Sequence, residues 1–145
     1  MMNIFPLNKD VYRDALQMII RYYKEYKNET THIVEAEKIL QNPNNKTIVF
    51  VNSVNKLIGL YVYHENNNNY FIHLFILDPC IRGTKTGYKF WKDMVNRLDN
   101  KPALISIIKK NKNIRKLISK RGKYLGSYLS KENEEIEYYN LSFKG

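Results

Sequence analysis

The chain has 145 residues, 43% of them hydrophobic, and a formal net charge of +10 at pH 7. This length and composition are those of a globular protein that buries its own core, and we expect a single domain over residues 1–145. They exclude a membrane-spanning helix and a membrane partner, because the sequence has no run of about 18 apolar residues.

The start of the chain and its cysteine count indicate the compartment. The sequence MMNIFPLNKD lacks the basic segment and apolar stretch of a secretory signal. The single cysteine, Cys80, has no partner for an internal disulfide, so we expect a reducing, cytoplasmic environment. For Cys80 itself the alternatives are a reactive thiol and a small residue in a turn.

The first half of the chain predicts two helices and four strands. Residues 3–7 form a short strand, and apolar residues at helical spacing predict a helix over 10–26. Thr30 or Thr31 can cap a second helix that ends at Leu40, before the turn sequence QNPNN. The following strands cover residues 46–51, 56–63 and 70–77, with polar turns at 52–55 and 65–69.

The second half repeats the alternation. A helix over 86–98 buries an apolar face that includes Phe90 and Trp91, and a strand follows over 103–108. A short helix over 111–120 ends at Gly122. Residues 124–129 and 136–143 then form an antiparallel pair around a polar turn.

The segment LFILDPCIRGTKTG, residues 74–87, carries the strongest functional signal. It places an apolar strand, a proline turn and a basic loop between two glycines directly before a helix. The first turn of a helix has unpaired N–H groups and the positive end of the helix dipole, so this junction predicts a phosphate site. The alternative is an ordinary strand-to-helix connection with surface lysines.

In its order of elements and in this loop the chain resembles the GCN5-related N-acetyltransferase (GNAT) superfamily, in a divergent, phage-type form. That family's loop, Arg/Gln-x-x-Gly-x-Gly/Ala, is matched at its ends by Arg82 and Gly87, whereas Lys85 replaces its central glycine. A later helix motif is matched in spacing by Asn111 and Gly122, with Ile118 at the position of the family's tyrosine.

The resemblance implies an α/β (α+β) fold. It has one mixed, mostly antiparallel sheet of six to seven strands, flanked by about four helices. The strands matched by residues 70–77 and 103–108 would splay apart around the pantetheine arm of acetyl-CoA. No metal site is implied.

The resemblance also implies which residues hold the cofactor. Backbone groups near Ile76 and Leu77 would pair with pantetheine, and the amides of residues 83–87 would hold the pyrophosphate. Asn111 matches a polar residue near the pantetheine arm, although a helix cap is its alternative role. The expected cofactor-binding residues are therefore Ile76, Leu77, Arg82, Gly83, Thr84, Lys85, Thr86, Gly87 and Asn111.

Acetyl transfer to an amine needs a general base and a proton donor for the departing thiolate. His73 is the main candidate base, with His64 and Glu65 as further candidates, and strand alternation predicts that it shares a face with Phe71 and Phe75. The alternative for His73 is a packed core histidine. Ile118 cannot donate a proton, so Tyr124 is the candidate in its neighbourhood.

The positive charge is concentrated in one segment. Residues 81–124 contain 14 basic and two acidic side chains. Such a segment attracts coenzyme A phosphates, nucleic acid or an acidic protein, although lysine-rich coding bias is an alternative explanation. The basic face predicted on the two later helices consists of Lys85, Lys89, Lys92, Lys112, Arg115, Lys116 and Lys120.

Two functions follow from these observations. The first is an N-acetyltransferase that moves an acetyl group from acetyl-CoA to a primary amine of a small molecule or protein. The second is a catalytically inactive binding or virion-associated protein of the same fold, whose basic face contacts nucleic acid or protein. The sequence leaves the acceptor and the oligomeric state open.

Overall fold

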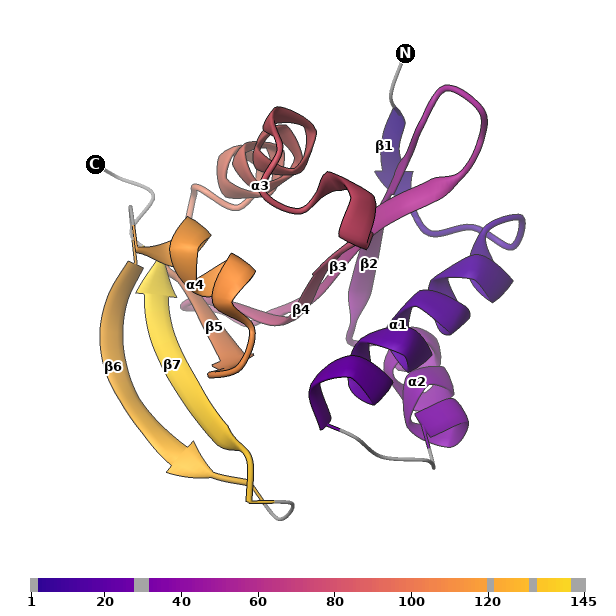
Figure 1. Cartoon of the computed structure of the whole chain (residues 1–145). Helices are drawn as coiled ribbons and strands as arrows, with labels where there is room; N and C mark the ends of the chain where they lie inside the picture. The colour runs from indigo at the N-terminus through magenta and orange to yellow at the C-terminus, as the bar shows by residue number, and fades with distance from the viewer. Residues whose placement is uncertain (1–2, 28–31, 120–121, 131–132, 142–145) are drawn as a thin grey trace.

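In a computed structural model the chain forms one seven-stranded sheet with helices on both faces, described over residues 3–27, 32–119, 122–130 and 133–141 (Figure 1). The strands are β1 (Asn3–Pro6), β2 (Lys46–Val51), β3 (Leu57–Glu65), β4 (Tyr70–Leu77), β5 (Ala103–Ile108), β6 (Gly122–Leu129) and β7 (Glu135–Leu141). The helices are α1 (Tyr12–Lys27), α2 (His32–Gln41), α3 (Lys85–Arg97) and α4 (Lys112–Ile118), with a 3₁₀ helix η1 (Pro79–Ile81).

The sheet is mixed and mostly antiparallel. Its strand order is β1-β2-β3-β4-β5-β7-β6, and the β4–β5 pair is the parallel one. Parallel neighbours need a crossover, and α3 supplies it. This arrangement confirms the expected fold class.

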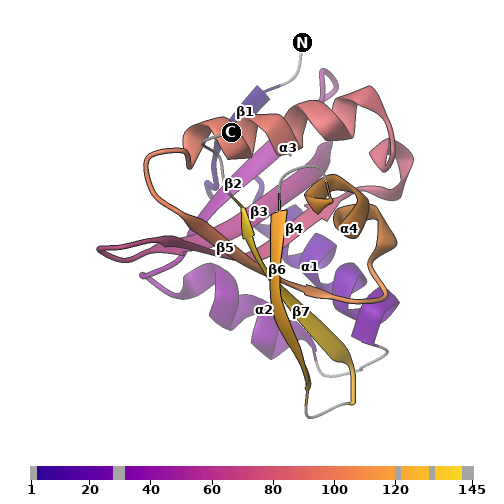
Figure 2. The ribbon, with the colours of Figure 1, turned by 90° about the vertical axis from the view of Figure 1, so that its left-hand side faces the viewer.

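Helices cover the two faces of the sheet as separate layers (Figures 1 and 2). On one face Ala15 and Ile19 of α1 are fully buried against strand residues such as Leu60. On the other face Phe90 and Met94 of α3 are fully buried, and Phe90 stacks on Phe50 with ring centroids 4.7 Å apart. The sheet is therefore enclosed by two apolar cores, one under α1 and α2 and one under α3 and α4.

Strands β4 and β5 separate after three paired positions. The pairs are Tyr70 with Ala103, Phe71 with Leu104 and Ile72 with Ile105, yet β4 continues to Leu77. In this stretch β4 keeps pairing with β3, and β5 keeps pairing with β7. The expected splay is confirmed, and it leaves one edge of the second half of β4 facing an opening.

Most predicted boundaries agree with the structure, and the bounds of β4 and β5 are as expected. The prediction that Gly122 ends a helix was wrong, because α4 ends at Ile118 and Gly122 begins β6. A Cβ at Gly122 would lie 2.2 Å from Ile118 Cγ2, so this glycine permits the close approach of β6 to α4. The predicted caps Thr30 and Thr31 lie outside the described residues, as does Lys120. Within those residues no helix has the length and apolar content to cross a bilayer.

Candidate active site

The junction between β4 and α3 is held by two side-chain caps. Asp78 caps η1 by accepting a hydrogen bond of 3.0 Å from the Cys80 amide. The Thr84 hydroxyl accepts a bond of 3.3 Å from the Gly87 amide and donates one of 2.6 Å to the Ile81 carbonyl. Because Thr84 is the cap, α3 begins at Lys85, one residue before the predicted start.

The two glycines of the loop are required for different reasons. Gly83 has φ +73°, a left-handed conformation that other residues adopt at a cost. At Gly87 a Cβ would lie 2.5 Å from the Ile81 carbonyl oxygen, so α3 packs directly on η1. Lys85 needs no such freedom, because it is the first residue of a helix. Replacing the family's central glycine by lysine therefore places no strain on this backbone.

A cavity of about 200 Å³ lies beside this loop, between the end of β4, the start of α3 and α4. The amides of Lys85 and Thr86 precede the first intrahelical bond, from the Tyr88 amide to the Thr84 carbonyl, and belong to the positive end of the helix. Lys116 adds a cation from α4. The residues lining this loop cavity are Leu77, Gly83, Thr84, Gly87, Tyr88, Asn113, Lys116 and Leu117.

Arg82 is engaged with α1 rather than with this cavity. Its Nη1 and Nη2 atoms lie 2.7 and 3.0 Å from the two carboxylate oxygens of Glu25, and its Nε donates to the Leu77 carbonyl at 3.0 Å. The bidentate pair lowers the pKa of Glu25 and keeps it ionised. A phosphate at Arg82 would therefore compete with Glu25, and the role of Arg82 in cofactor binding stays a prediction.

Strand alternation decides which backbone groups face the opening beside β4. The Asp78 amide donates to the Ile58 carbonyl at 2.9 Å, and Ile76 pairs with Leu60, so alternate residues from Asp78 backwards bond to β3. The N–H and C=O groups of Phe75 and Leu77 consequently point the other way. The sequence indicated Ile76 and Leu77 for this role and missed Phe75.

Asn111 combines a cap with a long-range contact. Its Oδ1 accepts a bond of 3.2 Å from the Ile114 amide at the start of α4, which confirms the cap. The side chain is buried and lies beside the Tyr22 hydroxyl of α1, whose pKa it lowers against the larger effect of burial. The sequence did not single out Tyr22, whose only signal was a hydroxyl on an otherwise apolar helix face.

A bulge in β4 places His73. Val62 pairs with Leu74 and Tyr63 pairs with Ile72, so His73 is the extra residue. The bulge reverses the alternation, and Phe75 packs in the core under α3 while His73 lies beside Leu74 on the α1 side. The prediction that His73 shares a face with Phe75 was therefore wrong.

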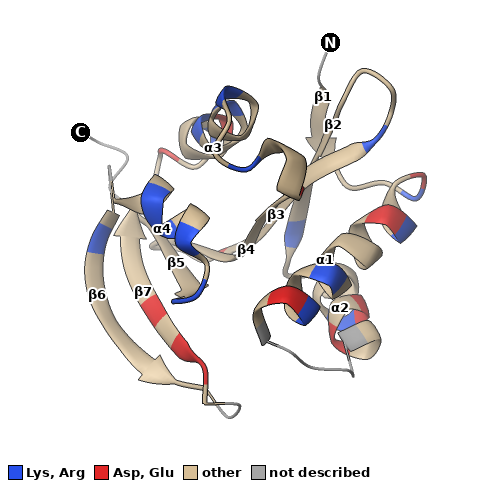
Figure 3. Ribbon diagram, viewed as in Figure 1, with Lys and Arg blue, Asp and Glu red and all other residues tan. Residues whose placement is uncertain are grey.

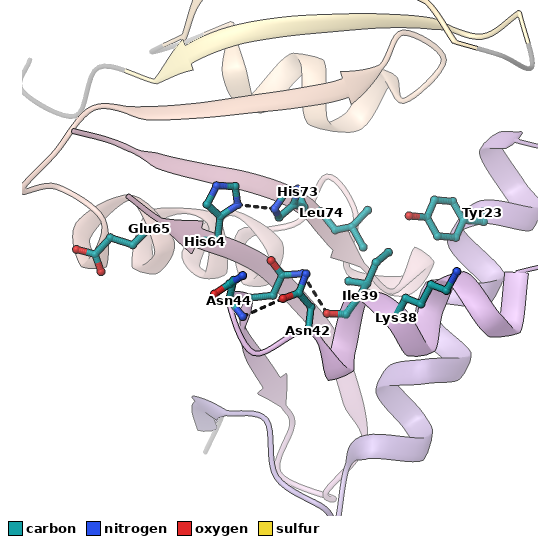
Figure 4. Close-up of a pocket in the computed structure, with 10 residues that line it drawn as sticks. Tyr23, Lys38, Ile39, Asn42, Asn44, His64, Glu65, His73 and Leu74 are labelled. Atoms are coloured by element: carbon teal, nitrogen blue, oxygen red, sulfur yellow. Dashed lines mark hydrogen bonds between the residues drawn. The ribbon is translucent and has the colours of Figure 1, made fainter. Parts of the chain in front are cut away.

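His73 and His64 form a pair at the wall of a cavity of about 600 Å³ (Figure 4). His64 Nδ1 and His73 Nε2 lie 2.7 Å apart, within hydrogen-bonding distance. Burial lowers the pKa of His73, and His64 lowers it further, so His73 is a neutral acceptor at pH 7. The residues lining this histidine cavity are Tyr23, Lys38, Ile39, Asn42, Asn44, Asn45, His64, Glu65, His73 and Leu74.

A smaller cavity of about 120 Å³ lies in the opening between β4 and β5 and shares His73 with the histidine cavity. His73 of β4 and Tyr22 of α1, which are far apart in the sequence, both line this cavity. The residues lining this cleft cavity are Tyr22, Tyr23, His73, Leu74, Ser106, Ile107, Ile108, Tyr128 and Ile136.

The remaining predicted residues lie apart from the cleft cavity. Tyr124 is on the edge strand β6, is 53% exposed, and contacts the Tyr139 ring edge-on at 5.6 Å. Ile118 is fully buried in the core. Glu65 forms an ion pair with Lys101, and exposed Cys80 hydrogen-bonds Asp78. The described residues contain no group of three or more side chains able to hold a metal ion.

The basic segment is partly neutralised by carboxylates, and Figure 3 shows where the charged residues lie. Among the described residues, six of its cations lie in ion pairs, five of them with carboxylates outside the segment and Arg97 with Asp93 inside it. The other five pairs are Arg82 with Glu25, Lys101 with Glu65, Lys109 with Glu135, Lys110 with Glu134 and Arg115 with Glu137. Contact of the basic face with nucleic acid stays a prediction.

Comparison with solved structures gives likenesses over nearly the whole chain. An acetyltransferase of the GNAT family from Staphylococcus aureus Mu50 is 16% identical with a TM-score of 0.69, covering 97% of this chain and 99% of that one. Spermidine N-acetyltransferase from Vibrio cholerae, in complex with CoA and spermine, is 12% identical with a TM-score of 0.71, covering 97% and 94%. Arabidopsis thaliana NAA60, in complex with a bisubstrate analogue, is 8% identical with a TM-score of 0.69, covering 97% of each.

At these identities the likeness establishes the fold, and the chain has the GNAT fold. No protein-family model and no curated protein sequence matches the chain.

Proposed function

We propose that this chain is an N-acetyltransferase that moves an acetyl group from acetyl-CoA to a primary amine. The observation that carries the proposal is the opening between β4 and β5, with the loop cavity at the end of β4 and His73 in the middle of the strand, just after the last residue that pairs with β5. Leu77 and His73 are four residues apart, which is roughly 13 Å along a strand. An extended cofactor arm fits between a phosphate site and a base at that separation.

The residues of the opening fit the cofactor. Acetyl-CoA supplies an acetyl group activated as a thioester. The outward amide and carbonyl groups of Phe75 and Leu77 can pair with the amides of pantetheine as an added strand does, although Arg82 already binds the Leu77 carbonyl. The amides at the start of α3, with Lys116 beside them, suit the pyrophosphate.

The histidine cavity suits the acceptor. It reaches the sheet at His73, on the α1 side of the opening. His73 takes a proton from the attacking amine, and its contact with His64 offers a path for that proton away from the reacting atoms. The tautomer of each ring decides which of the two contacting nitrogens donates. In either case one nitrogen of the contact donates a hydrogen bond and the other accepts it.

Binding of coenzyme A tests the proposal directly. We expect calorimetry to detect binding by the wild type, and Lys116→Glu to weaken it by roughly tenfold, because a charge-assisted contact to phosphate becomes a repulsion. Acetyl transfer to spermidine and to a lysine-containing peptide, followed by release of the free thiol, measures the activity.

Lys89→Glu is the matched control. It makes the same charge change on an exposed residue of α3 that does not line the loop cavity, so its affinity should stay within a factor of about two at moderate salt. Absence of heat and of a thermal shift with millimolar coenzyme A would contradict the proposed function.

A further inference from the structure

The departing thiolate needs a proton donor that the earlier candidates do not provide. Ile118 has no ionisable group and is fully buried, and Tyr124 lies on β6, separated from β4 by β5 and β7. Three inter-strand spacings put that strand roughly 14 Å from β4. The donor must therefore be another group in the opening.

Tyr22 lies in the opening itself. It lines the cleft cavity with His73 of β4 and Ser106 of β5. It also lines a second cavity of about 110 Å³, with Ile76 and Leu77 at the loop end of β4. Its hydroxyl interacts with Asn111, which lies three residues after the end of β5 and bonds through its backbone amide to the Ile108 carbonyl at 2.8 Å. A side chain with these neighbours spans the gap between the two diverging strands.

The contact with Asn111 leaves the phenol proton available. The Asn111 oxygen already accepts from the Ile114 amide in the cap of α4, so the group that Asn111 offers to the Tyr22 oxygen is its amide N–H. Burial raises the pKa of Tyr22 to about 12, so the hydroxyl stays protonated throughout the neutral range.

We propose that Tyr22 is the residue that protonates the thiolate leaving group of coenzyme A, with Asn111 as its positioning residue. The inference rests on the proposed function. The amine nitrogen bonds to the carbonyl carbon, the carbon–sulfur bond breaks, and its electron pair leaves with sulfur. The Tyr22 proton passes to sulfur, the nitrogen proton passes to His73, and the Tyr22 phenolate regains a proton from water.

Tyr22→Phe removes only the hydroxyl. We expect it to lower kcat for acetyl transfer by about 10²-fold or more, with the affinity for coenzyme A nearly unchanged. The second readout is the ionisation of the thiol of bound coenzyme A, followed by thiolate absorbance against pH. A hydroxyl aimed at sulfur stabilises the thiolate, so the thiol pKa should rise by about one unit in the variant.

Asn111→Asp is a second variant that keeps the cap. Its carboxylate still accepts from the Ile114 amide but no longer donates to Tyr22, so it captures the phenol proton. We expect kcat to fall with thermal stability retained. Tyr12→Phe, on the same helix but lining neither the cleft, the histidine nor the loop cavity, should leave both the thiol pKa and kcat within about threefold of wild type.

The outcomes separate cleanly. A Tyr22→Phe variant with wild-type kcat, or one that loses activity with the thiol pKa of bound coenzyme A unchanged, overturns this inference alone. A larger effect of Tyr12→Phe than of Tyr22→Phe also overturns it. A wild type that does not bind coenzyme A overturns the proposed function first, and this inference with it.

Discussion

His73→Gln should lower the rate of acetyl transfer by about 10²- to 10⁴-fold, the usual cost of losing a general base. Glutamine keeps a polar side chain of similar reach but accepts no proton at neutral pH. His73 lies away from the loop cavity, so the affinity for coenzyme A should be nearly unchanged. Steady-state kinetics measure the rate, with whichever of spermidine and a lysine-containing peptide is the better substrate. Calorimetry measures the affinity for coenzyme A.

The pH profile distinguishes catalysis from packing. His73 acts when neutral, so the rate falls as the pH drops through its pKa, which burial and His64 hold below the ordinary histidine value. His64→Gln removes the second of these effects, so the pKa of His73 should rise and the acid limb should move to higher pH. His73→Gln should abolish that limb.

The losses of activity in His73→Gln and in His64→Gln, compared with each other, identify the base. If His64→Gln costs as much activity as His73→Gln, the base is His64 or the pair acting together. If His73→Gln has wild-type activity and only lowers the melting temperature, His73 is a packed core residue, as the alternative from the sequence holds.

The strands around the site could be predicted because local patterns determine them. A run that is apolar except for His73 lies between polar turns and marks β4, and Pro102 followed by a run that is apolar except for Ser106 marks β5. The cap of α4 at Asn111 was likewise a local signal. The bulge at His73 carries no such signal, since it arises from pairing with β3, and it reverses the face of every residue after it.

The ion pairs and the position of Tyr22 could not be predicted, because they depend on segments that are far apart in the sequence. Arg82 and Glu25 are 57 positions apart, and Lys101 and Glu65 are 36 apart. Counting charge along residues 81–124 therefore overstates the field that the folded protein presents. Tyr22 of α1 and Asn111 at the start of α4 come together only in the folded chain, and no spacing in the sequence reveals this contact.

Gly87→Ala should destabilise the protein by about 2 kcal/mol. Alanine gains roughly 1 kcal/mol of helix propensity, whereas overpacking at the upper end of its usual range costs about 3 kcal/mol. The overpacking wins here because the Cβ would lie 2.5 Å from the Ile81 carbonyl oxygen, a backbone atom that cannot rotate away. Thermal unfolding should show a fall of roughly 4–8 °C, and the displaced first turn of α3 should also bind coenzyme A more weakly.

Two neighbouring substitutions isolate this steric cause. Gly83→Ala meets no atom within 4 Å but must keep φ +73°, so it should cost only about 1 kcal/mol, and Gly83→Asn should cost less. Lys89→Ala, at an exposed position of α3, should stay within about 0.5 kcal/mol of wild type. The expected order of damage is Gly87→Ala, then Gly83→Ala, then Lys89→Ala. A Gly87→Ala variant as stable as Lys89→Ala would mean that α3 moves away from η1 without cost, and the close packing that positions the loop amides would then not be needed for stability.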